Sequence, residues 1–136
     1  MEYISTRNKK KIFTFKDVFL KGLAPDGGLF VPKKVPFFSS RELTKLRSLS
    51  YNKLATEIIF KYCNDTFKKK EIQNLVNRSY KKFRVNEVVK LRKIKNVILL
   101  ELFHGPTLAF KDIAMQIIGN MYEKILKKKI KKLILL

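Results

Sequence analysis

The sequence is poor in several residue types, and each shortage excludes a class of protein. It has one cysteine among 136 residues, so it forms no intrachain disulfide and no cysteine-based zinc cluster. We expect this residue, Cys63, to pack as a small apolar side chain on a helix. No apolar run approaches the roughly 20 residues that span a bilayer, and no secretion signal follows Met1. The sequence therefore predicts a cytoplasmic protein without a membrane segment.

Acidic residues are also scarce: 31 Lys and Arg stand against 11 Asp and Glu, which gives a net charge of +20. Such a charge is typical of proteins that bind nucleic acid or anionic membranes. The basic residues are spread along the chain, however, with separate runs at residues 9–11, 68–70 and 127–132. Base readers favour arginine with interleaved aromatic residues, which these runs lack. A genome rich in A and T explains the lysine excess better, so nucleic acid is not the expected partner.

Capping signals and hydrophobic spacing predict a small, mostly helical amino-terminal domain. Thr14 and Ser39 each begin a capping-box pattern that opens a short helix, and two longer apolar periodicities follow. The four predicted helices lie at about residues 15–22, 40–47, 51–62 and 69–82. Short strands are predicted at residues 1–5 and 29–31. We assign residues 1–83 to this domain and residues 84–136 to the start of a second, α/β domain.

The second domain begins with two predicted strands, at residues 88–91 and 97–102. The latter is almost wholly apolar, as is typical of a strand covered on both faces. Helical spacing follows from Ile113 to Leu126, with Thr107 as the expected N-cap, and residues 133–136 predict another buried strand. Strand, helix and strand form a right-handed βαβ unit. Because the sequence stops inside an apolar strand, we expect a truncated chain.

One lysine differs from the others, which mostly lie on polar faces. Lys111 is expected at the first turn of the helix that follows the predicted strand at 97–102, beside the sheet. Positive partial charge at a helix N-terminus disfavours a cation, and burial against a sheet disfavours it further. Both effects favour the neutral amine, which is a nucleophile able to form a Schiff base with an aldehyde. The competing interpretation is an ordinary surface lysine in a first helical turn.

Three segments of the chain resemble one enzyme family. Residues 102–114, Leu-Phe-His-Gly-Pro-Thr-Leu-Ala-Phe-Lys-Asp-Ile-Ala, are similar to the cofactor-lysine segment of threonine synthases. Residues 3–7, Tyr-Ile-Ser-Thr-Arg, resemble the opening strand of that family, and residues 22–32 resemble its N-terminal signature. The three matches occur in the family's order and span most of the chain.

The resemblance implies a pyridoxal phosphate-dependent enzyme of the tryptophan synthase β-like fold, also called fold type II. Its implied reaction converts O-phospho-L-homoserine and water to L-threonine and phosphate, as a carbon–oxygen lyase acting on phosphates. Lys111 is then both the catalytic residue and the cofactor-binding residue, through a Schiff base, and no metal is implied. Family members continue with a Ser/Thr/Gly-rich loop that binds the cofactor phosphate. That loop is absent here, so residues 1–136 alone are expected to be inactive.

Other residues near the segment have several possible roles. Phe110 is expected either beside the cofactor ring or in the core, and His104 is expected to shape the loop, because nothing in the sequence pairs it with a carboxylate. Asp112 is expected to pair with a cation or to assist the helix start. Arg7 is able to hold a phosphate, although a strand end that closes the first domain is the safer interpretation.

Three alternatives to a threonine synthase remain open from the sequence. A threonine synthase-like phospho-lyase would use the same lysine and end by releasing a keto acid. A non-catalytic basic fragment would bind RNA or DNA, and an inert gene fragment would not fold stably alone. The residues also leave the oligomeric state undefined.

Overall fold

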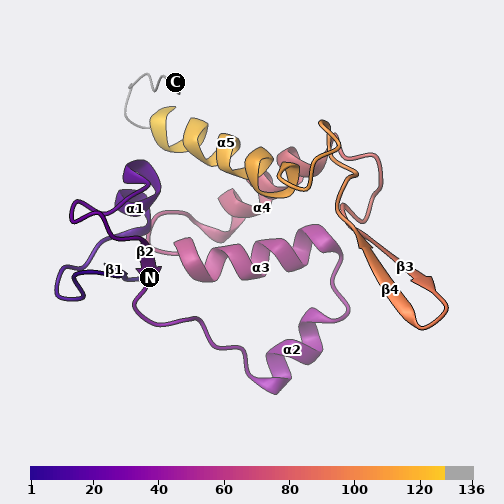
Figure 1. Ribbon diagram of the computed structural model, residues 1–136, viewed down its shortest axis with the longest axis horizontal. Coiled ribbons are helices and arrows are strands. Elements are labelled where there is room, and N and C mark those ends of the chain that lie inside the picture. The colour runs from indigo at the N-terminus through magenta and orange to yellow at the C-terminus, as the bar shows by residue number, and fades with distance from the viewer. Residues whose placement is uncertain (128–136) are drawn as a thin grey trace. The chain divides into compact units, whose positions relative to one another are not determined.

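A computed structural model describes residues 1–127 of the chain (Figure 1). Its contacts divide the chain into two compact units, one of residues 1–49 and 53–72, the other of residues 50–52 and the chain from Gln73 onwards. No helix in the described part of the chain has the length and apolarity needed to cross a membrane. Helices and strands occur in both parts of the sequence, which confirms the α/β class. The predicted domain boundary after Phe83 stays a prediction.

The first unit contains a two-stranded antiparallel sheet. Strand β1 (Tyr3–Ser5) pairs with β2 (Phe30–Pro32), and Tyr3 also forms an isolated bridge with Phe13. Aromatic rings pack together beside the sheet: the ring of Phe15 contacts the rings of Tyr3, Phe19 and Phe67. The buried apolar side chains of this unit are Tyr3, Phe13, Ala24, Cys63, Phe67 and Ile72.

The four predicted helices are confirmed. Helices α1 (Phe15–Lys21) and α2 (Ser40–Leu46) begin at capping boxes, in which Thr14 and Ser39 exchange hydrogen bonds with the residue three positions later. Gly22 caps the C-terminal end of helix α1 with a φ of +71°, a backbone conformation that glycine adopts at little cost in free energy. Helices α3 (Tyr51–Cys63) and α4 (Lys69–Tyr80) follow. Local hydrogen bonds therefore set where the short helices begin.

The capping carboxylate of Glu42 should make the first unit sensitive to acid. Its Oε1 accepts a hydrogen bond from the Lys61 amine at 2.9 Å, and its Oε2 accepts one from the Ser39 amide at 2.8 Å. The bond from Lys61, followed by those from Ser39, lowers the pKa of Glu42 from 4.5 to about 2. A depressed pKa contributes stability that is present above pH 4.5 and is lost as the pH falls towards 2.

We expect Glu42→Gln to remove part of the loss of thermal stability between pH 4.5 and about 2. Melting curves followed by circular dichroism at several pH values measure this change. Glu87→Gln is the matched control, because Glu87 is exposed and lies outside the network. An acid-induced loss of the same size in wild type and Glu42→Gln would contradict the assignment.

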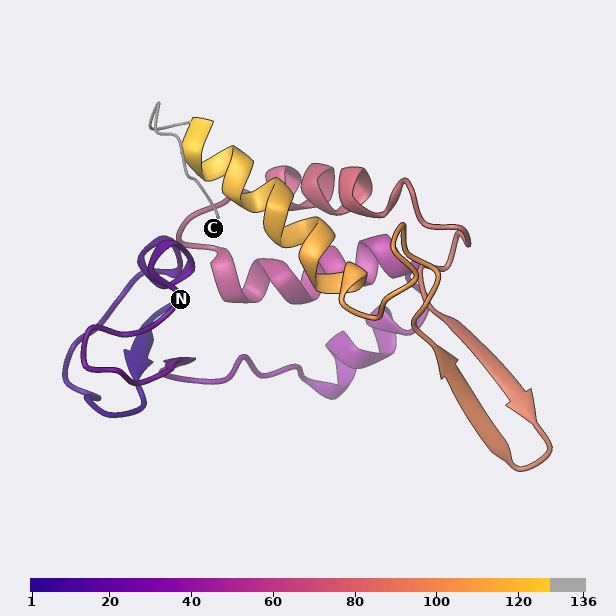
Figure 2. The same ribbon diagram turned by 45° about the horizontal axis from the view of Figure 1, so that its top comes forward.

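The second unit packs α5 (Asp112–Lys127) beside the end of α4, as both views show (Figures 1 and 2). The Asn120 amide donates a hydrogen bond to Ser79 Oγ at 2.8 Å, and the Tyr80 hydroxyl donates one to the Ile113 carbonyl at 3.0 Å. These bonds fix how the two helices align. Among the described residues of this unit, the buried apolar side chains are Leu75, Val76, Tyr80, Val88, Ile117, Met121 and Ile125.

A β-hairpin precedes α5. Strand β3 (Lys90–Ile94) pairs antiparallel with β4 (Val97–Glu101), and Ile94 lies opposite Val97. The two residues between them form the turn, in which Lys95 has a φ of +52°. Positive φ is typical of short hairpin turns. The strand predicted at residues 88–91 was therefore placed too early, because the tight turn pairs residues 90–94 with β4 instead.

Strand β4 is not covered, contrary to the prediction. The apolar side chains of residues 97–100 are between 45% and 66% exposed. The physical reason is that each strand of this hairpin has a single neighbour, and both of its faces are open. An apolar pattern indicates that a strand needs cover but does not say which segment supplies it. The predicted strand at 133–136 lies outside the described residues, so the βαβ unit is described only through β4 and α5.

Candidate active site

Lys111 occupies the N-cap position of α5. Its carbonyl accepts hydrogen bonds from the amides of Ala114 at 3.1 Å and Met115 at 2.8 Å, which begin the helix. The prediction that Thr107 is the N-cap was wrong, because residues 107–111 form turns instead. The Lys111 side chain is exposed, and its amine makes no hydrogen bond or ion pair within residues 1–127. Because the Lys111 carbonyl accepts the first hydrogen bonds of α5, the predicted position of Lys111 at a helix start is confirmed.

The burial predicted for Lys111 is wrong for the described residues. The expected sheet wall is the open β3–β4 hairpin, which covers neither its own apolar side chains nor the lysine. Phe110 is likewise 64% exposed, so it is not the core aromatic that was one of its two expected roles. Within residues 1–127, a helix start alone does not distinguish Lys111, because the Lys68 carbonyl begins α4 in the same way. What distinguishes Lys111 is the segment around it, which resembles the cofactor-lysine segment of threonine synthases.

A buried carboxylate closes the loop that carries Lys111. Asp112 is 3% exposed, and its two oxygens accept hydrogen bonds from the Thr107 amide at 2.7 Å and the Thr107 hydroxyl at 2.9 Å. Burial raises the pKa of Asp112, but the hydrogen bonds from Thr107 and Gln116 outweigh it and hold that pKa below its usual range. Asp112 also lies in the first turn of α5, where negative charge is favoured, which agrees with one of its two predicted roles.

The loop leaves little room around this carboxylate. A Cβ atom at Gly105 would lie 2.4 Å from both Cβ and Oδ2 of Asp112. Leu108, halfway along the loop, has a φ of +62°, which is unfavourable for a residue with a side chain. Its amide donates a hydrogen bond to the Gly105 carbonyl at 3.2 Å. Residues 105–112 thus form a tight ring, and we call it the Lys111 loop.

His104 has a carboxylate partner, so the expectation that it lacks one was wrong. Its Nε2 lies 2.8 Å from Oε2 of Glu101, and Oε1 of Glu101 lies 3.0 Å from Arg92 Nε. Glu101 is buried at the end of β4. The spacing of three residues between Glu101 and His104 could have indicated this pair in the sequence. Pairs at this spacing are usually expected on a helix, whereas Glu101 ends a strand. The pair joins the hairpin to the start of the Lys111 loop.

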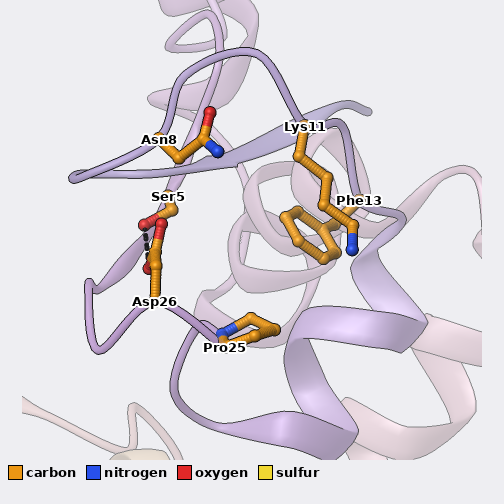
Figure 3. Close-up of a pocket in the computed structure, with 6 residues that line it drawn as sticks. All are labelled: Ser5, Asn8, Lys11, Phe13, Pro25 and Asp26. Carbon is orange, nitrogen blue, oxygen red and sulfur yellow. Dashed lines mark hydrogen bonds between the residues drawn. The ribbon is translucent and has the colours of Figure 1, made fainter.

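A separate cavity lies in the first unit and has a volume of about 250 Å³. Figure 3 shows its six lining residues: Ser5, Asn8, Lys11, Phe13, Pro25 and Asp26. Ser5 is buried; its hydroxyl donates to Asp26 Oδ1 at 2.7 Å and accepts from the Arg7 amide at 3.1 Å. The bond from Ser5 is the largest cause that lowers the pKa of Asp26.

The turn beside this cavity requires its glycine. A Cβ at Gly28 would lie 2.3 Å from Ser5 Oγ, so this position tolerates no side chain without a shift of β1. The Arg7 guanidinium donates to the Asp26 carbonyl at 3.2 Å. Arg7 is thereby tied to the same turn, which agrees with a strand end that closes the domain. Its possible role in holding a phosphate stays a prediction.

Other reactive groups are few in the described part of the chain. Cys63 is fully buried and unpaired, and burial raises the pKa of its thiol to about 12, which confirms its expected role in packing. Within residues 1–127, no cluster of three or more His, Cys, Asp or Glu side chains is arranged to hold a metal ion. Among the exposed lysines, Lys111 is the strongest candidate for covalent chemistry, because its segment resembles the cofactor-lysine segment of threonine synthases.

Comparison with known proteins gives one family. The model of the threonine synthase N terminus matches residues 2–80. The threonine synthase of Schizosaccharomyces pombe is 41% identical over 131 residues, which cover 95% of this chain and 26% of that protein. Threonine synthase-like 2 of Xenopus laevis is 34% identical over 131 residues, which cover 95% of this chain and 28% of that protein.

A solved structure gives the same result. The crystal structure of pyridoxal phosphate-bound threonine synthase from Brucella melitensis matches 97% of this chain and 29% of its own, with a TM-score of 0.92 and 36% identity. This similarity confirms the predicted fold class. The chain corresponds to an amino-terminal portion of that fold. The chain belongs to the threonine synthase family. It spans little more than a quarter of the length of these relatives.

Proposed function

We propose that this chain is the amino-terminal part of a threonine synthase, which converts O-phospho-L-homoserine and water to L-threonine and phosphate. One observation carries the proposal: the segment that resembles the family's cofactor lysine places Lys111 at the N-cap of α5, with an amine that has no partner among residues 1–127. The superposition on a pyridoxal phosphate-bound relative supports it. The reaction class is accordingly a carbon–oxygen lyase acting on phosphates.

The residues of the Lys111 loop fit pyridoxal phosphate. The Lys111 amine makes no bond within residues 1–127 that the cofactor would have to displace. Asp112 already defines the path of the loop without a ligand, through its bonds to Thr107. Pyridoxal phosphate supplies an aldehyde that an amine can capture and a ring that accepts electrons. Lys111 would therefore hold it.

Proton transfer is the part of the reaction that we assign to the chain's own residues. The Lys111 amine would take protons from the α and β carbons of the substrate and return them to the γ and α carbons. Phosphate leaves the γ carbon, and water adds to the β carbon, which gives threonine. Because the backbone of Lys111 is fixed at a helix start, one amine serves several transfers. The net charge of +20 attracts a phosphorylated substrate.

The proposal is tested with the longest translated product that carries residues 1–136. We expect borohydride reduction in the presence of pyridoxal phosphate, followed by peptide mass mapping, to find a pyridoxyl group on Lys111. Preincubation with O-phospho-L-homoserine should lower this labelling, because the substrate amine competes for the aldehyde. A stoichiometric label on a different lysine, unaffected by the substrate, would overturn the assignment.

A phospho-lyase that ends in a keto acid is the second candidate, because the residues of the Lys111 loop do not separate it from a synthase. The threonine synthase-like 2 protein of Xenopus laevis also matches 95% of this chain. Both candidates release phosphate from O-phospho-L-homoserine and use the same lysine. Quantifying threonine and keto acid in the same reaction mixture separates them. A keto acid formed in equal amount to phosphate would favour the phospho-lyase.

We propose that residues 1–136 alone release no phosphate from O-phospho-L-homoserine. The chain spans little more than a quarter of the length of its relatives, and the wall expected beside Lys111 is absent from the described residues. We also place the protein in the cytoplasm, because Cys63 is an unpaired, buried thiol, as is usual in a reducing compartment. Phosphate release by the purified 136-residue chain would overturn the first of these statements.

A further inference from the structure

We propose that Asp112 is a positioning residue: by binding both donors of Thr107, its carboxylate fixes the backbone that presents the Lys111 amine. The proposal rests on the function proposed above for Lys111. It concerns the carboxylate next to the lysine in sequence, whose two oxygens already have partners other than that amine. Asp112 would thus act through the backbone and not as an ion pair with Lys111.

The hydrogen bonds define the carboxylate's orientation fully. Oδ2 accepts from the Thr107 amide and Oδ1 from the Thr107 hydroxyl, so both oxygens are engaged by one residue on the far side of the loop. Gln116, one turn further along α5, approaches Oδ1 at 3.5 Å. A buried carboxylate with partners on both oxygens has little freedom to turn. It therefore joins the beginning of the loop to the beginning of the helix.

The rest of the loop is built to keep this contact. Gly105 gives Asp112 its space, because a side chain there would come within 2.4 Å of the carboxylate. Leu108 is held at a φ of +62°, a conformation that persists only when the surroundings enforce it. Closing the ring between residues 107 and 112 supplies that constraint. An exposed acid at a helix start would need neither the space at Gly105 nor the positive φ of Leu108.

The position of Lys111 depends on this contact, because Lys111 lies between the start of α5 and the side chain that closes the ring. Its carbonyl begins α5, and the next side chain closes the ring, so its Cα atom cannot move without breaking one of them. A displacement of about 1 Å in a reacting group can cost about 100-fold in rate. We therefore expect loss of the Asp112 contact to lower kcat much more than it raises KM.

The first experiment needs no cofactor and uses the 136-residue chain. We expect Asp112→Ala to speed amide hydrogen exchange at Thr107 and Leu108 by about 10-fold or more, because the ring opens. Gly105→Ala should do the same by pushing the carboxylate away. Asp112→Asn should restore most of the protection, since its amide keeps one acceptor and gains a donor for the Thr107 hydroxyl oxygen.

Two matched controls separate this effect from general loosening of α5. Glu123→Gln removes another carboxylate of the same helix, which pairs with Arg78 and Lys127. Gly119→Ala adds a Cβ that meets nothing within 4 Å. Neither should change exchange at residues 107 and 108. If Asp112→Ala proves too unstable, Thr107→Val tests the same ring by removing only the hydroxyl donor.

The second experiment uses the product that carries the whole active site. Asp112→Ala should lower kcat for phosphate release by about 100-fold while a pyridoxyl label still forms on Lys111, and Asp112→Asn should lie within a few-fold of wild type. An Asp112→Asn variant as impaired as Asp112→Ala, or unchanged exchange in Asp112→Ala, overturns the proposal. Absence of the label on Lys111 in the wild type instead overturns the proposed function, and the exchange experiment still decides whether Asp112 holds the loop.

Discussion

On the function proposed above, Lys111→Ala in the longest translated product that carries residues 1–136 is expected to lower phosphate release from O-phospho-L-homoserine by about 10³-fold or more, because one substitution removes both the cofactor's covalent anchor and the base. The fold should tolerate the change. Lys111 is exposed and its side chain makes no bond within residues 1–127, so the free energy of unfolding should change by less than about 0.5 kcal/mol. Loss of activity without loss of stability is the combined result to look for.

Two control variants make this prediction specific to the amine. Lys111→Arg keeps a positive charge, but a guanidinium stays protonated and forms no stable bond to the aldehyde, so activity should be lost as in Lys111→Ala. Lys93→Ala removes an exposed lysine of β3 and should leave activity within about two-fold, because surface substitutions away from the site are nearly neutral. Retention of more than a tenth of the activity in Lys111→Ala would contradict the assignment.

The largest expected effect on stability belongs to Ile72. Its side chain is fully buried in α4, within the first unit. Ile72→Ala removes three carbon atoms and leaves a cavity, which should lower the free energy of unfolding by about 3 kcal/mol. Urea unfolding monitored by circular dichroism measures the change. A loss of this size is a substantial part of the about 5–15 kcal/mol that stabilises a typical domain.

Ile94→Ala is the matched control for this prediction. Ile94 is half-exposed at the end of β3, so the same truncation there leaves no closed cavity. We expect its effect on the free energy of unfolding to stay within about 0.5 kcal/mol. Equal losses in the two variants would show that burial at residue 72 does not stabilise the unit.

The sequence predicted best those features that depend on neighbouring residues. The capping boxes at Thr14 and Ser39 specify both donor and acceptor within four residues, and both helices begin where the pattern placed them. The position of Lys111 at a helix start followed instead from the helical spacing that begins at Ile113, although the predicted N-cap at Thr107 was wrong. Apolar spacing likewise identified the buried face of α5, at Ile117, Met121 and Ile125.

Features that depend on distant or missing neighbours were not predictable. The apolar sequence of β4 indicates a covered strand, yet its side chains are exposed, and the burial expected for Lys111 depended on the same cover. Thr107 looked like an N-cap because its hydroxyl was expected to bond the helix backbone. It bonds the Asp112 side chain instead, five residues later, and the helix starts there. Side chain–side chain bonds across a loop leave no periodic signal.

The uncovered hairpin also shapes the colloidal behaviour of the chain. Strand β3 carries Arg92 and Lys93 opposite the apolar Leu99 and Ile98 of β4, and Lys90 opposite Glu101. Like-charged edges repel one another, which keeps two such ribbons from associating edge to edge in dilute buffer. Added electrolyte shortens the reach of that repulsion to about 10 Å at 0.1 M. The cations of β3 thus oppose self-association of the chain through its exposed hairpin.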